Sequence, residues 1–390
     1  MPESPLRILV VVTQLTIGGT ERSLLAVLPR LDRRRFAVEV ATTRGPGRLD
    51  SALREAGIPV HTPPALLPRK ANVAVAGPAL LWRALTRPPD IAHFFLPEAY
   101  LVGGLASLAA LRTRRIMSRR SLNRYQRTRP LVTRLEGWLH RRMDAVVGNS
   151  RAVTAELAAE GAPAERLALI PNGIDTARFR RQDRGAARAA LGLPDGSFAM
   201  VMLATLLPYK GHADVLQALG AVRGDLPEGW CLLLAGRDEG IGGALKEQAR
   251  SLGIADNVRF LGELTPDEVP KLLAAGDLGL LASHEEGFPN AALETMAAGL
   301  PMLATAAGGA AEAVEDRITG RLVPPQDPAA LSQALRELAA DPPLRARFGA
   351  AGKELVAARF SLERSVALTE ALYTAVATGG SIEGLGSDTE

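Results

Sequence analysis

The chain is poor in the residues that stabilise small secreted domains and metal sites. It has one cysteine and five histidines in 390 residues. One cysteine cannot form an internal disulfide, and there is no Cys/His cluster, so we expect no structural metal. Cys231 lies in the apolar run 230–235, where it is expected to pack in a core. This cysteine usage is typical of an intracellular protein, and we predict a cytoplasmic location.

Long apolar runs are missing as well. No run approaches the roughly 20 residues that a membrane-spanning helix requires. Residues 1–7 contain no basic region followed by a cleavable apolar stretch, so residues 8–12 are interpreted as a first strand and not as a signal peptide. With 47% hydrophobic residues, the chain is long enough to bury two full cores.

Lysine is rare, and the positive charge is uneven along the chain. There are 41 arginines and 5 lysines. Residues 1–180 carry 28 basic and 14 acidic residues, whereas the rest of the chain carries 18 basic and 28 acidic ones. The net charge of +4 therefore hides a basic half and an acidic half. This asymmetry indicates that the basic half faces a polyanion, either an anionic membrane leaflet or a nucleic acid.

Much of the basic charge lies in one segment. Residues 112–142 contain eleven arginines and one acid, Glu136, with apolar residues such as Trp138 between them. One interpretation is attachment to an anionic membrane surface, with Trp138 at headgroup level and residues 119–121 near an acceptor. The alternative is a solvated, partly helical surface. No recognised nucleic-acid module accompanies the charge, so nucleic acid is not an expected partner.

Two series of short apolar runs alternate with helical patterns. The first series has runs at 7–12, 36–42, 90–95, 115–118 and 145–150, and the second has runs at 198–203, 230–235, 258–261, 278–282 and 301–304. Short apolar strands alternating with helices predict an α/β fold with parallel sheets that are covered on both faces.

Two Rossmann-like domains are the simplest organisation for these series. We predict an N-terminal domain over residues 1–180 and a second domain over 181–361, because the polar, arginine-rich stretch 178–196 precedes the second series. Ligands of such sheets bind outside the carboxyl ends of the strands. Residues 379–390 are polar and glycine-rich, and we predict a disordered tail there.

The most informative segment is 283–294, which places two carboxylates, Glu286 and Glu294, eight positions apart. Asn290 is a good N-cap for a helix over 291–298 that Gly299 would close. The free N–H groups of such a helix end form an anion site suited to a diphosphate. Each glutamate can accept hydrogen bonds from sugar hydroxyls, which favours a nucleotide-sugar ligand. The alternative is an ordinary exposed loop and a solvated helix.

This segment resembles the Glu-x7-Glu motif of the retaining glycosyltransferases of family 4, which have the GT-B fold. The resemblance extends from Arg7 to about Tyr373 and implies two Rossmann-like domains whose parallel sheets face an interdomain cleft. It implies that Glu294 binds the nucleotide ribose and that Glu286 contacts the donor sugar. The loop amides of the residues between them would hold the diphosphate; these residues are Gly287, Phe288, Pro289 and Asn290. The resemblance also implies that a last helix, 362–378, packs back on the N-terminal domain.

Further segments carry the same resemblance. Lys210, in 204–211, matches a lysine that neutralises the donor diphosphate, although the arginine that many relatives carry upstream of it is missing here; an N-terminal arginine is one candidate replacement. Gly18 and Gly19 match a glycine-rich turn that lets the backbone approach the donor phosphate, and a plain tight turn is the alternative. Phe260 matches a position beside the nucleotide base.

His93 lies at a predicted strand end, where many relatives carry two histidines two residues apart. The second position is Phe95 in this chain. His93 is therefore our third candidate for the chemistry, with Glu286 and Lys210, through a contact with the sugar. The alternative is a buried histidine with a structural role.

The resemblance implies a retaining, metal-independent transfer of a sugar from a nucleotide-diphosphate sugar to an acceptor hydroxyl, with no cofactor. The basic N-terminal half indicates a lipid-linked or membrane-surface acceptor in bacterial polysaccharide or cell-envelope synthesis. Peripheral attachment to the inner face of the cell membrane is then expected. A first alternative is a non-catalytic GT-B-like protein that binds nucleotide-sugars or acts as a scaffold. A second alternative keeps the fold but changes the reaction, as in an epimerase or a phosphorylase.

Overall fold

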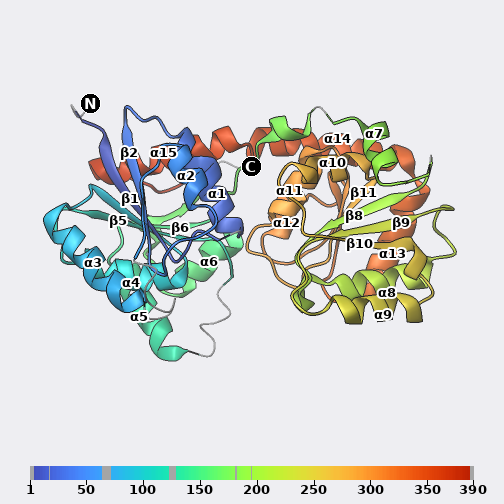
Figure 1. The fold of residues 1–390 in the computed structure, drawn as a ribbon, viewed down its shortest axis with the longest axis horizontal. Helices are drawn as coiled ribbons and strands as arrows, with labels where there is room; N and C mark the ends of the chain where they lie inside the picture. Colours follow the sequence, from blue (N-terminus) through green and yellow to red (C-terminus); the bar gives the residue numbers. More distant parts are fainter. Residues whose placement is uncertain are drawn as a thin grey trace. The chain divides into compact units, whose positions relative to one another are not determined.

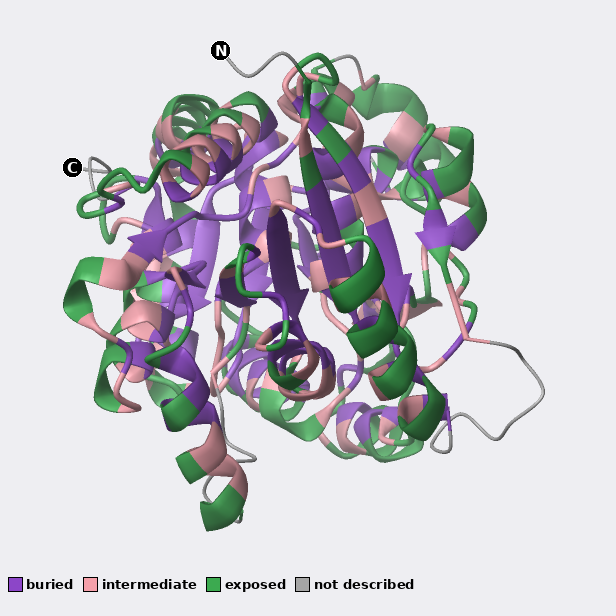
Figure 2. Cartoon of the chain, turned by 90° about the vertical axis from the view of Figure 1, so that its left-hand side faces the viewer, coloured by how far each residue is buried: buried purple, intermediate pink, exposed green. Residues whose placement is uncertain are grey.

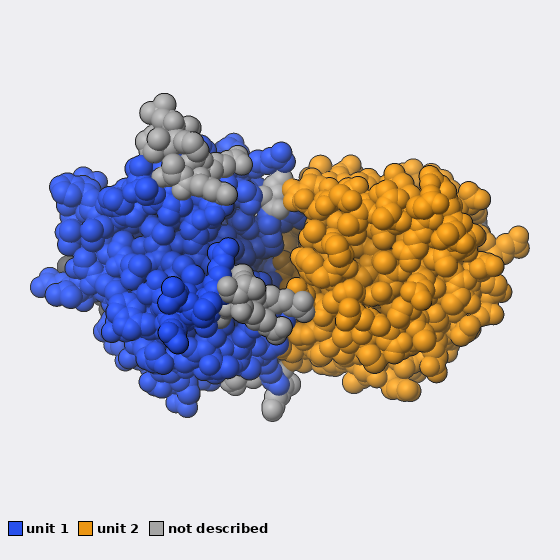
Figure 3. Space-filling model, turned by 90° about the horizontal axis from the view of Figure 1, so that it is seen from below, with its two compact units in different colours: residues 1–173, 362–390 blue, residues 174–361 orange. Residues whose placement is uncertain are grey.

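The structure, a computed structural model, describes residues 4–16, 18–63, 72–122, 129–180, 182–194 and 196–386. The chain divides into two compact units, coloured blue and orange in Figure 3. Unit 1 comprises Met1–Gly173 and Leu362–Glu390, and unit 2 comprises Ile174–Ser361.

The border between the units lies seven residues before the boundary expected at 180. Ile174 and Phe179 are buried in the core of unit 2. The backbone N–H of Ile174 also donates to the carbonyl of Phe360, 2.8 Å away. The polar stretch that follows in the sequence therefore belongs to unit 2, because two apolar residues before it are needed for that core.

Unit 1 is built on a seven-stranded sheet with the order β3-β2-β1-β4-β5-β6-β7 (Figure 1). All neighbouring strands are parallel. The strands are β1 (Leu6–Val12), β2 (Phe36–Thr42), β3 (Val60–His61), β4 (Ile91–Phe95), β5 (Arg114–Arg119), β6 (Ala145–Gly148) and β7 (Leu167–Leu169). The strand order reverses between β1 and β4, which is the switch point where ligands of such sheets bind.

Helices cover both faces of this sheet, and Figure 2 shows the strands buried beneath their exposed outer surfaces. One face packs against α1 (Gly19–Val27), α2 (Asp50–Glu55) and α15 (Leu362–Thr378). The other face packs against α3 (Asn72–Thr86), α4 (Pro97–Ser107), α5 (Pro130–His140) and α6 (Arg151–Ala159). The helix expected over 362–378 thus lies in unit 1, where Tyr373 is fully buried.

Unit 2 is built on a six-stranded sheet with the order β10-β9-β8-β11-β12-β13, and its neighbouring strands are also parallel. The strands are β8 (Ala199–Leu203), β9 (Cys231–Ala235), β10 (Val258–Gly262), β11 (Leu278–Leu281), β12 (Met302–Thr305) and β13 (Gly320–Val323). The switch point lies between β8 and β11. The predicted parallel α/β architecture is confirmed in both units.

The helices of unit 2 also form two layers. One layer contains α8 (His212–Val222), α9 (Gly242–Ser251) and α13 (Pro328–Ala340). The other contains α7 (Arg184–Ala190), α10 (Glu268–Ala275), α11 (Asn290–Ala297), α12 (Ala310–Ala313) and α14 (Pro342–Arg359). Cys231 is buried in β9, as expected for a core residue. None of the helices among the described residues combines the length and the apolarity that crossing a bilayer requires.

The tail expected to be disordered over 379–390 has a defined position up to residue 386. Ile382 is buried in the core of unit 1. The carbonyl of Leu385 accepts a hydrogen bond from the backbone N–H of Leu169, at 3.1 Å, beside the edge strand β7. Two apolar residues in a polar segment are enough to hold it against this edge, and composition alone did not reveal them.

A buried ionic network fixes α5 and α6 to β5 in unit 1. Arg119 donates to Glu160 at 2.5 Å and lies 3.4 Å from Glu136. His140 lies 3.2 Å from Glu160 and 2.9 Å from the hydroxyl of Tyr100. Burial by itself would raise the pKa of Glu160, but the hydrogen bonds from His140 and Arg119 and the charge of Arg119 outweigh it and lower the pKa to about 2.

We predict that Glu160→Gln destabilises the protein at neutral pH, by on the order of 2 kcal/mol. The folded-state pKa of Glu160 is depressed below its ordinary value of 4.5. Its contribution is therefore complete above about pH 4.5 and is lost as the pH falls toward 2. Thermal unfolding from pH 7 to pH 3 should show a flatter pH dependence in the variant, whereas Glu165→Gln, at an exposed site, should behave as the unmodified protein. If the melting temperatures of Glu160→Gln and of the unmodified protein changed with pH in parallel, the depressed pKa of Glu160 would be contradicted.

Candidate functional site

Two loops flank the switch point of unit 2. The loop after β8 carries Lys210, and the loop after β11 carries Glu286. β8 and β11 are parallel neighbours in the sheet, so the loops that follow them lie side by side at the carboxyl ends of the strands. This is the position where ligands bind in doubly wound sheets. The fold therefore brings together two of the predicted catalytic residues.

The two side chains form a short ion pair. Nζ of Lys210 lies 2.5 Å from Oε1 of Glu286, and the hydroxyl of Ser283 donates to the same oxygen at 2.8 Å. Both charged side chains are largely but not fully covered. Ser283 is fully buried, and its carbonyl accepts from the hydroxyl of Thr305 at 2.5 Å. Ser283 thus orients the Glu286 carboxylate, a role that sequence reasoning missed because serine is common in loops.

A second set of bonds ties the same loops together. The backbone N–H of His284 donates to the carbonyl of Tyr209 at 2.7 Å. Nε2 of His284 lies 2.7 Å from Oδ2 of Asp214, which is in the first turn of α8. The backbone on both sides of Lys210 is therefore tied to the loop after β11.

Two glycines are required by the close approach of these loops. Gly211 has φ of +72°, and a Cβ there would lie 1.9 Å from the carbonyl oxygen of Ala282. Gly309, in the loop after β12, donates its N–H to the carbonyl of Glu286 at 3.1 Å. A Cβ at Gly309 would lie 2.2 Å from the carbonyl oxygen of Gly287. Three loops thus meet with no room for side chains at these two positions.

Helix α11 begins one residue earlier than predicted. Asn290 is its first residue and not its N-cap; Pro289 occupies the cap position and no side chain caps the helix. Phe288 is buried, with its ring 5.3 Å from that of Phe360, and anchors the loop in the core. Glu294 is half-buried one turn into the helix. Gly299 closes the helix with a left-handed φ of +86°, as predicted.

Phe260 is partly buried in the edge strand β10 and packs against the core on the α8 and α9 side. Nζ of Lys246 lies 5.4 Å from its ring centroid.

The basic residue expected upstream of Lys210 is missing from the β8 loop, but Arg237 follows β9 in the neighbouring loop. The carbonyl of Arg237 accepts from the N–H of Leu206 at 2.9 Å, so Arg237 lies in the loop beside the one that carries Lys210. Its guanidinium pairs with Glu239.

His212, the first residue of α8, was not identified from the sequence. It is buried, and burial lowers its pKa to about 4, with a smaller contribution from the charge of Lys210. His212 is therefore neutral at physiological pH and adds no positive charge beside Lys210.

In unit 1, Gly18 and Gly19 begin α1 at the carboxyl end of β1. Gly18 is the N-cap, and the carboxylate of Glu21 folds back against it, since a Cβ at Gly18 would lie 2.4 Å from Oε2 of Glu21. Thr16 donates to the same carboxylate at 3.0 Å. The Glu21 carboxylate thus fills the space beside Gly18, and a side chain at Gly18 would displace it.

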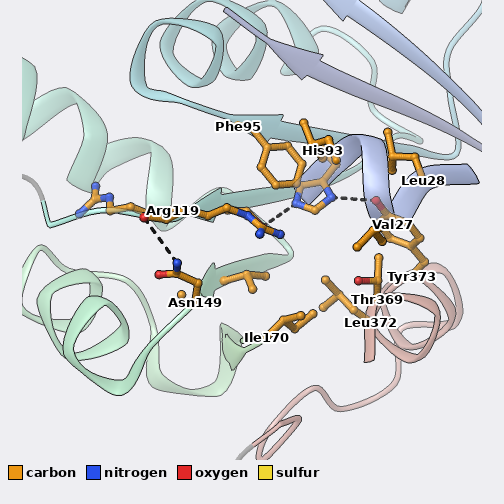
Figure 4. A pocket seen from close by; sticks show the side chains of 15 residues that line it. Val27, Leu28, His93, Phe95, Arg119, Asn149, Ile170, Thr369, Leu372 and Tyr373 are labelled. Atoms are coloured by element: carbon orange, nitrogen blue, oxygen red, sulfur yellow. Dashed lines mark hydrogen bonds between the residues drawn. The ribbon is translucent and has the colours of Figure 1, made fainter. Parts of the chain in front are cut away.

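His93 lies in β4 with both ring nitrogens engaged inside unit 1. Nδ1 lies 2.9 Å from the hydroxyl of Tyr373, and Nε2 lies 2.7 Å from the hydroxyl of Ser118. Figure 4 shows the imidazole between Phe95 and Tyr373. The side chain is 3% exposed, and burial, followed by the charge of Arg120, lowers its pKa well below the ordinary value. This geometry favours the structural alternative over contact with a sugar.

Arg120, directly after β5, differs from the other arginines of its segment. Its Nη1 donates to Ser23 at 2.6 Å and to Asn172 at 2.7 Å, and its guanidinium lies 5.6 Å from the ring centroid of Phe95. These partners are neutral, and no carboxylate of the described chain forms an ion pair with it. Burial lowers its pKa to about 10, so it remains charged at neutral pH.

A small cavity opens beside Arg120 within unit 1. Its lining includes Thr20 at the start of α1, Leu96 after β4 and Ser121 after β5. Leu96 has a φ of +69°, which is unusual for a residue with a Cβ. The cavity therefore lies at the carboxyl ends of the central strands and combines a charged group, a hydroxyl and a strained turn.

Family models match nearly all of this framework. The model described as Glycosyltransferase Family 4 matches residues 17–178, and the model described as Glycosyl transferases group 1 matches residues 183–355. The chain belongs to the family 4 glycosyltransferases. Membership of this family, which was expected from the sequence, is thereby confirmed.

Curated relatives agree with this family. The D-inositol 3-phosphate glycosyltransferase of Salinispora arenicola is 34% identical over 252 residues, which are 61% of this chain and 56% of that protein. The protein of the same name from Streptomyces avermitilis is 35% identical over 218 residues, which are 54% of this chain and 47% of that one. The chain thus spans about half the length of the curated relatives it matches.

Solved structures confirm the GT-B fold. The structure of Anabaena HepE in complex with UDP matches with a TM-score of 0.81 and 24% identity, covering 95% of this chain and all of that one. WaaG, a glycosyltransferase involved in lipopolysaccharide biosynthesis, matches with a TM-score of 0.72 and 19% identity, over 96% of this chain and 100% of that one.

We predict that Gly211→Ala disrupts the packing of the loops after β8 and β11. A Cβ there meets the Ala282 carbonyl and also requires a left-handed conformation, which together should lower the melting temperature by roughly 5 °C. Gly243→Ala is the matched control, because a Cβ there meets no atom within 4 Å and its φ is ordinary. Differential scanning calorimetry of both variants makes the comparison. Equal melting temperatures would show that the two loops are less tightly constrained than the geometry indicates.

We predict that His93→Gln lowers the stability of the protein and leaves the turnover per folded molecule unchanged. The change removes or distorts bonds to two buried hydroxyls, which should cost about 2 kcal/mol. Tyr373→Phe removes one of these bonds from the opposite side and should cost a similar amount. The measurement is chemical denaturation together with turnover per folded molecule. Normal stability with lost turnover would restore His93 as a catalytic residue.

Proposed function

We propose that this chain is a retaining, metal-independent glycosyltransferase that moves a sugar from a nucleotide-diphosphate sugar to an acceptor hydroxyl. The observation that carries the proposal is the Lys210–Glu286 pair beside the start of α11, at the switch point of unit 2. It places a cation, a carboxylate and a helix N-terminus at one sheet edge, in a chain of this family. Support from related structures comes from HepE, which has been solved with UDP-glucose.

In this proposal the donor diphosphate lies at the N-terminus of α11. The ammonium of Lys210 turns from Glu286 to the diphosphate and stabilises the negative charge that grows on it as the sugar departs. Glu286, held by Ser283, then accepts hydrogen bonds from the sugar hydroxyls. Glu294 accepts from the two ribose hydroxyls. The N–H groups of the loop from Gly287 to Asn290 bind phosphate oxygens.

The transfer itself needs no cofactor. The acceptor oxygen forms a bond to the anomeric carbon on the face from which the diphosphate leaves. The bond between that carbon and the phosphate oxygen breaks, and its electron pair stays on the diphosphate. The proton of the acceptor hydroxyl passes to a donor phosphate oxygen. Protein groups therefore position the two substrates and stabilise charge.

We propose that unit 1 binds the acceptor, at the cavity beside Arg120 and Ser121. A positively charged guanidinium with neutral partners suits an acceptor that carries an anionic group. The basic character of this half supports a lipid-linked acceptor, or one at a membrane surface, in polysaccharide or cell-envelope synthesis. Peripheral attachment to the inner face of the cell membrane follows from that acceptor.

A donor screen tests the proposed reaction. The protein is incubated with UDP-, GDP-, ADP- and dTDP-sugars in the presence of EDTA, with and without membrane lipid, and release of nucleoside diphosphate is measured. We expect release from one donor. Glu294→Ala should lower kcat/KM for that donor by about 10–100-fold, because two ribose hydroxyls lose their acceptor. Lys210→Ala should lower kcat by about 100-fold or more.

The control is Glu247→Ala, at an exposed glutamate on α9, which should leave turnover unchanged. Release that requires a divalent metal would contradict metal independence. Product analysis by NMR determines whether the anomeric configuration is retained. No release from any donor, combined with thermal stabilisation by a nucleotide, would support the alternative of a non-catalytic nucleotide-sugar-binding protein.

A further inference from the structure

Exposed large hydrophobic side chains are concentrated in one part of unit 1. Among the described residues, ten such side chains are exposed, and eight of them lie between residues 75 and 138. The eight are Val75, Leu81, Trp82, Leu85, Leu105, Leu111, Leu131 and Trp138. They belong to α3, α4 and α5 or to the segment directly after α4, which together form the outer layer on one face of the sheet (Figure 1).

Helix α3 has an apolar face toward solvent. Its exposed positions recur every three or four residues, and in order they are Ala74, Val75, Pro78, Ala79, Leu81, Trp82, Leu85 and Thr86. The one charged residue of the helix, Arg83, forms an ion pair with Glu39 of β2. A surface helix of a soluble domain normally places charged and polar residues on its outer face. An uncharged outer face along the whole helix indicates that this face binds an apolar surface, such as a lipid bilayer or another protein.

The neighbouring helices extend this surface. α4 contacts both α3 and α5. Gly77 of α3 would place a Cβ 3.6 Å from the side chain of Val102 of α4, so the two helices lie close together. Leu105 is exposed on α4, and Leu111, just after it, is 91% exposed. We call the surface formed by the eight exposed side chains the apolar face of unit 1.

Arginines surround the apolar face and acids do not. Residues 72–142 contain thirteen arginines and three acids. Each acid is engaged: Asp90 with Arg7, Glu98 with Arg44, and buried Glu136 with Arg119. Six arginines on or directly beside these helices are exposed; they are Arg87, Arg112, Arg129, Arg134, Arg141 and Arg142. The surroundings of the apolar face are therefore positive.

We propose that the apolar face of unit 1 docks on an anionic lipid bilayer, with Trp82 and Leu85 entering the boundary between headgroups and acyl chains. The surrounding arginines contact lipid phosphates. A second copy of the chain is a poorer occupant, because it would bring the same arginines against one another. This docking rests on the proposed function in one respect, which is that the acceptor lies at a membrane.

The structure assigns the membrane attachment to a different segment from the arginine-rich one that the sequence indicated. Several arginines of 112–142 form bonds inside unit 1, although Arg114 remains exposed. Arg114 pairs with Asp144, and Arg115 donates to the carbonyls of Ser107 and Ala110. Arg119 and Arg120 are engaged as described above. The apolar insertion therefore belongs to α3, which the charge pattern alone did not indicate.

Vesicle binding by the full chain tests this docking surface. Co-sedimentation is measured with vesicles of equal parts phosphatidylglycerol and phosphatidylcholine, and with phosphatidylcholine alone. We expect strong binding to the anionic vesicles only. A double variant, Trp82→Ser with Leu85→Ser, should bind them at least about tenfold more weakly, because two inserted side chains are lost. Ile318→Ser is the matched control, since Ile318 is 55% exposed but lies in unit 2.

Two further readouts separate apolar insertion from attachment by charge alone. Tryptophan fluorescence should shift to the blue on vesicle binding, because Trp82 is 70% exposed whereas Trp230 is already buried. The double variant should melt at the same temperature as the unmodified protein, because both side chains are exposed. Attachment through arginines alone would be fully released by salt, whereas insertion leaves a salt-resistant part.

Three results would overturn the proposal. The first is unchanged vesicle binding by the double variant. The second is no binding to anionic vesicles by the unmodified protein. The third is a dimer in light scattering that the double variant abolishes, which would assign the apolar face to a second copy. Nucleoside diphosphate release is measured without vesicles in parallel, so failure of docking and failure of the proposed reaction are distinguishable.

Discussion

The close approach of the loops after β8 and β11 is the constraint on which the candidate donor site depends. Gly211 leaves no space for a side chain beside the carbonyl of Ala282, and this contact brings Lys210 within 2.5 Å of Glu286. The hydroxyl of Ser283 fixes the carboxylate. The parallel register of the two strands makes the approach possible, because their loops leave the same edge of the sheet.

Arginine serves two different purposes in this molecule. Inside unit 1 it joins helices to the sheet, as Arg119 does with Glu160, and its planar guanidinium can satisfy several oxygens at once. Outside, the remaining arginines lie around an apolar layer of helices. A count of charge along the chain cannot separate these purposes, because both kinds of arginine alternate within the same segment.

Family membership limits the chemistry and leaves the substrates open. The loops after β8, β11 and β12 that meet in unit 2 depend on the fold. The proposed acceptor site depends on particular side chains, such as Arg120 with its neutral partners Ser23 and Asn172. The family can therefore be assigned, whereas the donor and the acceptor have to be identified by experiment.

The sequence by itself determined the parallel α/β fold and most strand positions, because strand periodicity and loop glycines are local signals. It also proposed Lys210 and Glu286 as candidates, and the structure places these two side chains 2.5 Å apart. Only the tertiary structure decided that His93 is enclosed by Tyr373 and Ser118, since those partners are 280 and 25 positions away. The unit border, the ordered tail up to residue 386 and the apolar face of unit 1 likewise depend on which side chains are buried. Burial is set by contacts between distant segments, and no local pattern records it.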